Sequence, residues 1–285
     1  MDRIKIVPGL IWLKFISMIV SPRILIGYFY GLWLGFLVGQ QFVSYSSVFQ
    51  IGIFDSFILL MNRPLNLSLI IIGFFVLIAD APFVNGRTYY VMIRSGTLAW
   101  HISMLGYLFL QLMIYMGMIM LGCIIPEVIR GNVTMEWSES MQILLKATPK
   151  NAILVYNFPI IDGKLLETWS SGETAAHCFL LCFLYTFFLG LIVYIGNLNF
   201  SLPIGHLCAV AIHFIGVLTL SDFVPVYWLS LVAHGILQYH IPKSGELSLV
   251  HSYALFLMSN AITLLLLRKN IPYIDYNVAA SDRFW

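Results

Sequence analysis

The chain has 285 residues, of which 60% are apolar and only 10% are charged, and its net charge is +2. Average soluble chains are about 45–50% apolar and about 25% charged. A water-soluble fold of this composition would lack the polar residues needed to cover its exterior. The composition therefore predicts an all-α integral membrane protein, and so small a net charge gives no indication of nucleic-acid binding.

The N-terminal segment contains a short apolar stretch, Leu10–Val20, which includes Lys14 and is followed by Pro22. This stretch is too short to span a bilayer and lacks the small-residue cleavage site of a signal peptide. We expect an amphipathic helix that lies in the inner membrane interface, with Trp12 and Phe15 at the level of the headgroups.

Five charge-free intervals locate the candidate spans, since a spanning helix needs roughly 20 residues to cross about 30 Å of hydrocarbon. The longest interval is divided in two by glycine, asparagine and Pro203. The predicted spans are Ile24–Val43, Asn66–Val84, Leu98–Ile124, Ala175–Tyr194, Pro203–Leu220 and Leu249–Leu267. We expect a single transmembrane domain over 1–285, with an interfacial N-terminal helix (1–23), a six-span core (24–267) and a cytoplasmic tail (268–285).

Charge asymmetry predicts the orientation of these spans. If both termini lie inside, the inner segments carry nine lysines and arginines against four acids, and the outer segments carry six against nine. This distribution agrees with the positive-inside rule, although the rule is weak for the long outer loop after the third span, which holds Lys146, Lys150 and Lys164, three of the six outer cations. We expect a multi-pass protein of the cell membrane with both termini in the cytoplasm.

Four glycines in the first span, Gly27, Gly31, Gly35 and Gly39, are each four residues apart and share one helix face. Small residues at this spacing let two helices approach closely in lipid. The face predicts either packing against another helix of the same chain or a seam between two subunits.

The inner loop between the second and third spans combines aromatic residues with arginines. Within it, Thr88–Arg94 predicts a short helix with Gly86 and Gly96 at its two ends, and Tyr90 and Arg94 would share a face. The segment is either an ordinary inner loop or a docking helix for a cytoplasmic partner, whose interface would favour such residues. The candidate docking residues are Arg87, Tyr89, Tyr90, Arg94 and Trp100.

The outer segments are unusually apolar for loops that face water. Ile51–Met61 and Ser221–Ile241 are each too short to cross the membrane and return, so we expect re-entrant or interfacial half-helices there. The candidate outer-gate residues Pro225, Tyr227 and Trp228 lie in the second of these segments. The long outer loop also predicts an amphipathic helix, because Trp137, Met141, Leu144 and Leu145 recur at helical spacing.

Motifs that would indicate chemistry on this chain are missing from the sequence. It holds no Gly-x-x-x-x-Gly-Lys-Ser/Thr loop, no His-Glu-x-x-His and no Gly-x-Ser-x-Gly. The histidines within the spans, including His206 and His213, lack partner carboxylates near the membrane centre, so we interpret them as structural. We expect no enzyme activity, no cofactor and no metal site on this chain.

Several of these segments together resemble the permease subunit of a type-2 ABC exporter of Gram-positive bacteria. Asp80-Ala-Pro-Phe, followed by Tyr90-Val-Met-Ile-Arg-Ser-Gly and Trp100, is similar to the family's coupling region. Leu189–Asn199 resembles the end of its fourth span, and Tyr227–Ser230 resembles the segment before its sixth. The long third-to-fourth outer loop departs from the minimal members of the family.

The resemblance implies six spans, a coupling helix between the second and third, and re-entrant outer helices before the sixth. It also implies ABC ATPase subunits that bind ATP and Mg²⁺ beneath the membrane, and a second permease chain, identical or related, with a seam at the first and fifth spans. The cargo would be hydrophobic or amphipathic, such as a peptide, lipid or drug. The alternative is a secondary transporter or channel that needs no ATPase.

Overall fold

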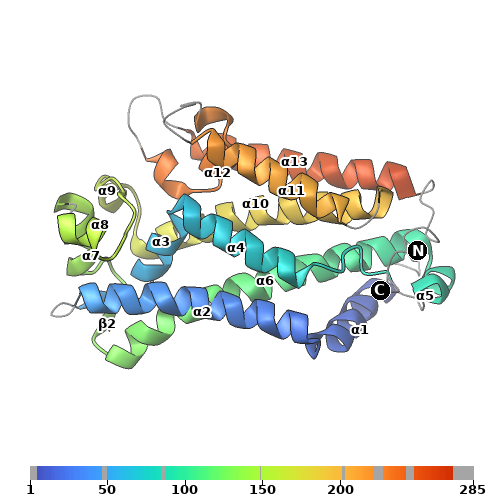
Figure 1. The fold of residues 1–285 in the computed structure, drawn as a ribbon, viewed down its shortest axis with the longest axis horizontal. Helices are drawn as coiled ribbons and strands as arrows, with labels where there is room; N and C mark the ends of the chain where they lie inside the picture. The colour runs from blue at the N-terminus through green and yellow to red at the C-terminus, as the bar shows by residue number, and fades with distance from the viewer. Residues whose placement is uncertain are drawn as a thin grey trace.

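The structure is a computed structural model that describes residues 5–46, 50–84, 88–147, 149–200, 203–220, 227–241 and 247–271, with the side chains of residues 89, 151, 227 and 270 excepted. Regular structure in these ranges is almost entirely α-helical, which confirms the predicted all-α class. The helices that run along the long axis of the molecule (Figure 1) are α2 (Pro22–Tyr45), α4 (Pro64–Leu77), α6 (Thr97–Arg130), α10 (Ser171–Asn199), α11 (Ile204–Leu218) and α13 (Leu249–Asn270).

Among the described residues, four of these helices are long and apolar enough to cross a membrane: α2, α6, α10 and α13. A fifth crossing is obtained if α3 (Asp55–Met61) and α4 form one broken span, since the two helices meet at an angle of 86°. The remaining helix, α11, has 15 residues and is shorter than a full span. Four of the six predicted spans are therefore present as single long helices.

The second predicted span ends earlier than the sequence indicated. We expected it to reach Val84, but α4 stops at Leu77 and the chain then turns. Pro82 prevents the helix from continuing to Val84, because proline has no amide hydrogen to donate and disfavours helical geometry in the residue before it. The polar Asp80 then pairs with Arg23 at the start of α2, with 2.7 Å between the two charged groups.

Local signals set the ends of the long helices. Ser21 caps α2 by accepting from the Ile24 amide, and Pro22 occupies the first turn, where its missing amide hydrogen is not needed. Ser170 and Glu173 form a reciprocal capping box at the start of α10. Gly131, with φ +78°, ends α6.

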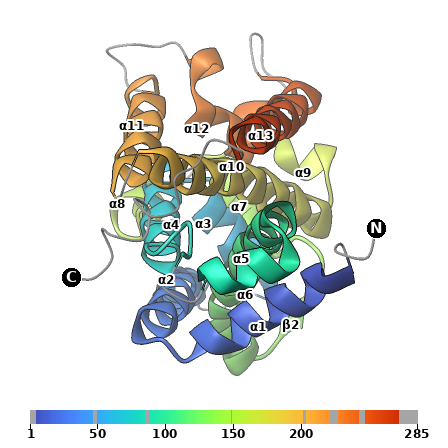
Figure 2. The same ribbon diagram turned by 90° about the vertical axis from the view of Figure 1, so that its right-hand side faces the viewer.

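One end of the molecule carries two short helices that lie across it (Figure 2). These are α1 (Val7–Ile19), which packs against α6, and α5 (Thr88–Ser95), which lies between α4 and α6 in the chain. Both match segments that the sequence predicted to be helical. On α1, Trp12 is largely exposed and Val7 is buried, so the helix presents an apolar surface outward.

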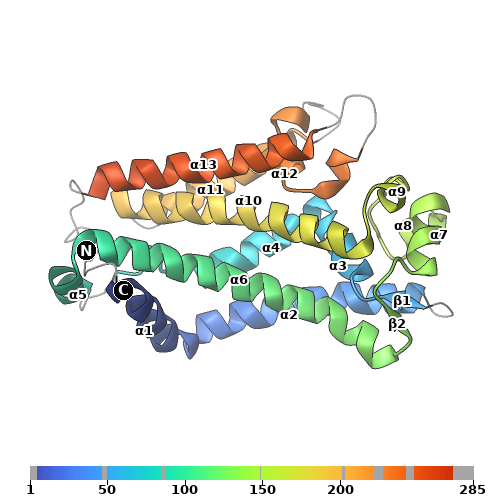
Figure 3. The same cartoon turned by 180° about the vertical axis from the view of Figure 1, so that it is seen from behind.

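The opposite end is formed by loops with short elements (Figure 3). The strand β1 (Ile51–Gly52) pairs in parallel with β2 (Val133–Thr134) and ties the chain after α2 to the chain after α6. The helices α7 (Glu139–Ala147), α8 (Lys150–Leu154) and α9 (Leu165–Thr168) follow. The predicted amphipathic helix is confirmed as α7, which buries Met141, Leu144 and Leu145, whereas Trp137 precedes the helix.

The helix α10 occupies the centre of the molecule, because it contacts α11 and α13 on one side and α6, α3 and α4 on the other. Before α13, the chain forms three short turns of helix: η2 (Tyr227–Leu229), α12 (Leu231–His234) and η3 (Leu237–His240). Viewed from the α1–α5 end, α4 lies between α2 and α11 (Figure 2). These three helices form one lateral face of the molecule.

Candidate functional site

Two of the candidate docking residues, Tyr90 and Arg94, lie on the exposed side of α5. Tyr90 is 69% exposed, and Ile93 and Arg94 beside it are also exposed. Tyr90 and Arg94 are one helical turn apart and share the outward surface, as predicted. The result is a small aromatic and cationic surface at the end of the molecule.

The other predicted docking residues have different positions. Trp100 is buried in α6 beside His101, so it supports the core instead of facing a partner. This position follows from its place in the first turn of a long buried helix, where its large apolar ring is removed from water. Arg87 lies outside the described residues, and of Tyr89 only the helical backbone is described.

A cavity of about 420 Å³ lies between α1, α5 and α6. Its walls are largely apolar and include Met18, Val91 and Met104, and Lys14 also lines it. The Lys14 ammonium donates to the Phe83 carbonyl at 3.4 Å and lies above the Phe83 ring. These contacts link α1 to the segment that precedes α5, so the position of α5 depends on both neighbouring elements.

The glycine face of α2 packs within the chain. A Cβ at Gly35 would meet the backbone of α6, at 2.9 Å from the Cys123 nitrogen and closer still to the Ile119 carbonyl. A Cβ at Gly39 would lie 2.7 Å from the Cys123 carbonyl, and Gly31 faces the Tyr115 ring. Gly27 completes the face against Leu77 of α4. Of the two predicted roles, the structure thus favours packing inside the chain, because α6 and α4 already cover this face.

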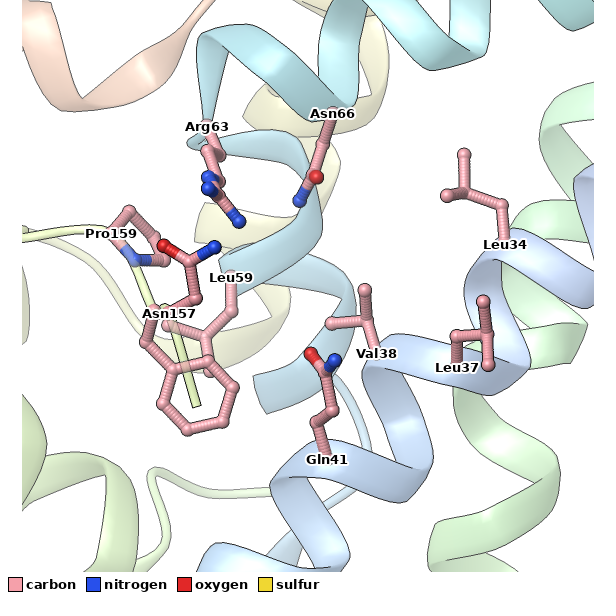
Figure 4. Close-up of a pocket in the computed structure, with 10 residues that line it drawn as sticks. Leu34, Leu37, Val38, Gln41, Leu59, Arg63, Asn66, Asn157 and Pro159 are labelled. Carbon is pink, nitrogen blue, oxygen red and sulfur yellow. The ribbon is translucent and has the colours of Figure 1, made fainter. Parts of the chain in front are cut away.

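An open pocket of about 130 Å³ lies where the α3–α4 turn meets α2 and the outer loop (Figure 4). Polar side chains reach it from three separate parts of the chain: Gln41 from α2, Arg63 and Asn66 from the start of α4, and Asn157 from the loop after α8. The rest of its wall is apolar or proline: Leu34, Leu37, Val38, Leu59, Phe158 and Pro159. No pattern in the sequence indicates this pocket.

The predicted outer-gate residues are only partly described. Trp228 is 60% exposed, Pro225 lies outside the described residues, and the Tyr227 side chain is not described. Next to this segment, His234 and His240 both contact the Ser252 hydroxyl, at 2.6 and 2.7 Å.

Four histidines of the long helices have hydrogen-bond partners, as expected of structural residues: His101, His177, His206 and His213. His213 contacts the Ser68 hydroxyl at 2.8 Å and the Tyr185 hydroxyl at 2.9 Å, and so links α11 to α4 and α10. His101 contacts the Tyr194 hydroxyl at 2.8 Å. These pairs satisfy polar groups in an apolar interior, which is a structural role.

No group of three histidine, cysteine, aspartate or glutamate side chains that is able to hold a metal ion occurs in the part of the chain that the structure describes. Comparison of the chain with models of protein families, with curated proteins and with solved structures finds no match. At the level of class, the chain is an all-α protein with several helices suited to crossing a membrane.

Proposed function

We propose that this chain is the membrane-spanning permease subunit of an ATP-driven exporter of the type-2 ABC class, in the cell membrane with both termini in the cytoplasm. In this proposal α2, α6, α10 and α13 are four of six spans. The shorter helices α4 and α11 are the other two. Both α3 and the η2–α12–η3 segment then serve as re-entrant outer half-helices, because irregular backbone at membrane depth must be buried in protein or face water.

The observation that carries the proposal is the surface of α5. A short helix sits at one end of the bundle, between α4 and α6 in the chain, and exposes Tyr90, Ile93 and Arg94. Aromatic residues and arginine are enriched where proteins bind one another. The position between two helices along the molecule suits an element that transmits movement of a partner to both.

The mechanism follows from this arrangement. Two ATPase subunits would bind ATP and Mg²⁺ beneath the membrane, and their closure would displace α5. Because α5 contacts α6, a helix of 34 residues that is about 50 Å long, the displacement would reach the outer end directly. Two permease chains, identical or related, would then open a path for a hydrophobic or amphipathic cargo, with Trp228 at the outer gate.

Purification of the tagged chain from its native membrane in mild detergent tests the proposal. An ATP-binding subunit should co-purify in stoichiometric amount, and the preparation should hydrolyse ATP. Arg94→Glu should reduce both by reversing the charge on the exposed side of α5. The matched control is Arg268→Glu, which reverses an exposed charge at the end of α13 and should leave the assembly intact.

The alternative, a secondary transporter or channel, makes the opposite prediction. The chain alone, reconstituted in liposomes, would then move its cargo without ATP. That result, together with assembly unaffected by Arg94→Glu, would overturn the exporter proposal.

A further inference from the structure

We infer that the pocket formed by Gln41, Arg63, Asn66 and Asn157 binds the oxyanion head, a carboxylate or phosphate, of an amphipathic molecule whose apolar chain lies along α2. The inference rests on the unpaired cation, the buried amide, and the apolar track that leaves the pocket. The site does not depend on the exporter proposal, but the identification of its occupant as cargo does.

The cation in the pocket has no counter-ion among the described residues. The Arg63 guanidinium is half-buried and makes neither a hydrogen bond nor an ion pair with any of them. The acid of the adjacent helix α3, Asp55, is fully buried and is engaged by the Gly52 amide and the Ser138 hydroxyl. The planar guanidinium is therefore available to make two parallel hydrogen bonds to one carboxylate or phosphate.

The side-chain amide of Asn66, which also lines the pocket, is buried and unpaired within the described part of the chain. Asn66 is only 8% exposed, yet its side chain has no hydrogen-bond partner among the described residues. It points into the pocket together with Arg63, toward the amides of Asn157 and Gln41 (Figure 4). Buried polar groups are almost always hydrogen-bonded in native proteins. The Asn66 amide donates N–H groups of the kind that an oxyanion accepts from, and this completes a set of donors from separate segments.

The backbone adds to the preference for a negative charge. Arg63 is the cap residue of α4 and Pro64 is its first helical residue. The first turn of a helix carries the positive end of its dipole, which favours an anion nearby. All four polar lining side chains are neutral or cationic, so none of them repels an anion.

An apolar track leads away from the pocket along α2. Phe29, Trp33, Leu37 and Gln41 are each one helical turn apart, and the first three are between 41% and 65% exposed. The distance from Phe29 to Gln41 along the helix is about 18 Å, which is close to half the thickness of the hydrocarbon core. An apolar chain laid on this track would hold its charged head at Gln41 and Arg63.

The binding experiment uses the full chain in an uncharged detergent, with dodecyl phosphate, dodecanol and inorganic phosphate as probes and native mass spectrometry as the readout. We expect dodecyl phosphate to bind at least tenfold more tightly than dodecanol, and inorganic phosphate not to compete with it. Arg63→Gln should weaken the binding of dodecyl phosphate at least tenfold and leave that of dodecanol unchanged. Lys146→Gln removes an exposed cation of α7, outside the pocket, and is the matched control.

A second variant keeps the test decisive if Arg63→Gln folds poorly. Asn66→Asp keeps the shape of the side chain but places a carboxylate in the pocket, so dodecyl phosphate should again bind less tightly. Equal affinity of the wild-type chain and both variants for dodecyl phosphate would overturn the inference. Dodecanol that binds as tightly as dodecyl phosphate would do the same.

The source of the natural ligand is resolved by a second arm. Wild-type chain is loaded with phosphatidylglycerol and then exposed to dodecyl phosphate. Retention of the lipid identifies a resident membrane phospholipid, and its displacement identifies an exchangeable amphiphile, as expected of cargo. Both outcomes support an oxyanion site, whereas a phosphatidylglycerol load that Arg63→Gln does not reduce contradicts it. Neither arm includes an ATPase, so failure of the exporter proposal would not affect them.

Discussion

Replacement of Gly35 by alanine should separate the two most extensively packed helices of the structure, α2 and α6. The new Cβ would lie 2.9 Å from the Cys123 nitrogen and closer to the Ile119 carbonyl, both of which are backbone atoms. Carbon–oxygen contacts at helix interfaces are normally about 3.3–3.6 Å. The helices must therefore move apart locally by about 0.5–1 Å, because no flexible side chain is present to yield.

The size of the effect follows from overpacking. An extra methyl group in a close-packed interior costs about 1–3 kcal/mol. For a chain of this size, about 1 kcal/mol corresponds to a change in melting temperature of about 2–4 °C. We therefore expect Gly35→Ala to lower the melting temperature by about 2–12 °C, with loss of part of the dispersion energy between α2 and α6.

The cysteines of the chain provide the assay. Cys123, Cys178 and Cys182 are buried, whereas Cys208 is exposed. In a Cys208→Ser background, a maleimide dye that fluoresces on reaction with thiols should report unfolding by reaction with the three buried cysteines.

Gly117→Ala is the matched control for this prediction. Gly117 lies on the same interface helix, α6, but a Cβ there would have no atom within 4 Å. The melting temperature of the Gly117→Ala variant should stay unchanged or rise slightly, since alanine favours helix more than glycine does. Equal melting temperatures of Gly35→Ala and Gly117→Ala would show that α2 and α6 are not close-packed at Gly35. A subunit seam at Gly35 would instead give an unchanged melting temperature with loss of the oligomer.

A further variant tests a buried contact between the ends of α10 and α11 and the segment after α4. Asn197→Ala should destabilise the fold by about 1–3 kcal/mol in the same melting assay, because the buried amide donates to the Ala81 carbonyl at 2.9 Å and accepts from the Gly205 amide at 2.8 Å.

The long helices could be predicted from the sequence because a bilayer imposes one simple requirement. Intervals without charge and of sufficient length indicated α2, α6, α10 and α13, and the structure has a helix in each. The early end of α4 at Leu77 was missed because an apolar window does not register Pro82, which acts through backbone geometry.

The pocket at Arg63 could not be predicted from such patterns. Its polar groups come from positions 41, 63, 66 and 157, and no periodicity in the sequence connects them. They meet because α3 turns by 86° into α4 and because the loop after α8 returns to the same place. The burial of Trp100 was missed for a similar reason, since an aromatic residue near an inner loop suits both an interface and a core.

Under the exporter proposal, we expect the second permease to pack on the lateral face of α2, α4 and α11, and the lengths of α4 and α11 support this expectation. The helices α4 and α11 have 14 and 15 residues, or about 21 and 22 Å, against about 30 Å of hydrocarbon. They are neighbours in the structure, so the membrane is crossed incompletely along one continuous face. Lipid does not tolerate exposed irregular backbone at this depth, whereas a partner subunit or a water-filled path between two subunits does.

A photo-reactive side chain tests this face without knowledge of the partner. Benzoylphenylalanine in place of Ile72, which is 55% exposed on α4, should cross-link in native membranes to a second chain of permease size. The same replacement at Ile262, which is 57% exposed on α13, should give no such product, because α13 lies away from α4 (Figure 2). A product from position 262 and none from position 72 would move the seam to α13. It would also contradict a transport path between two chains beside the Arg63 pocket, because that pocket opens next to α2 and α4.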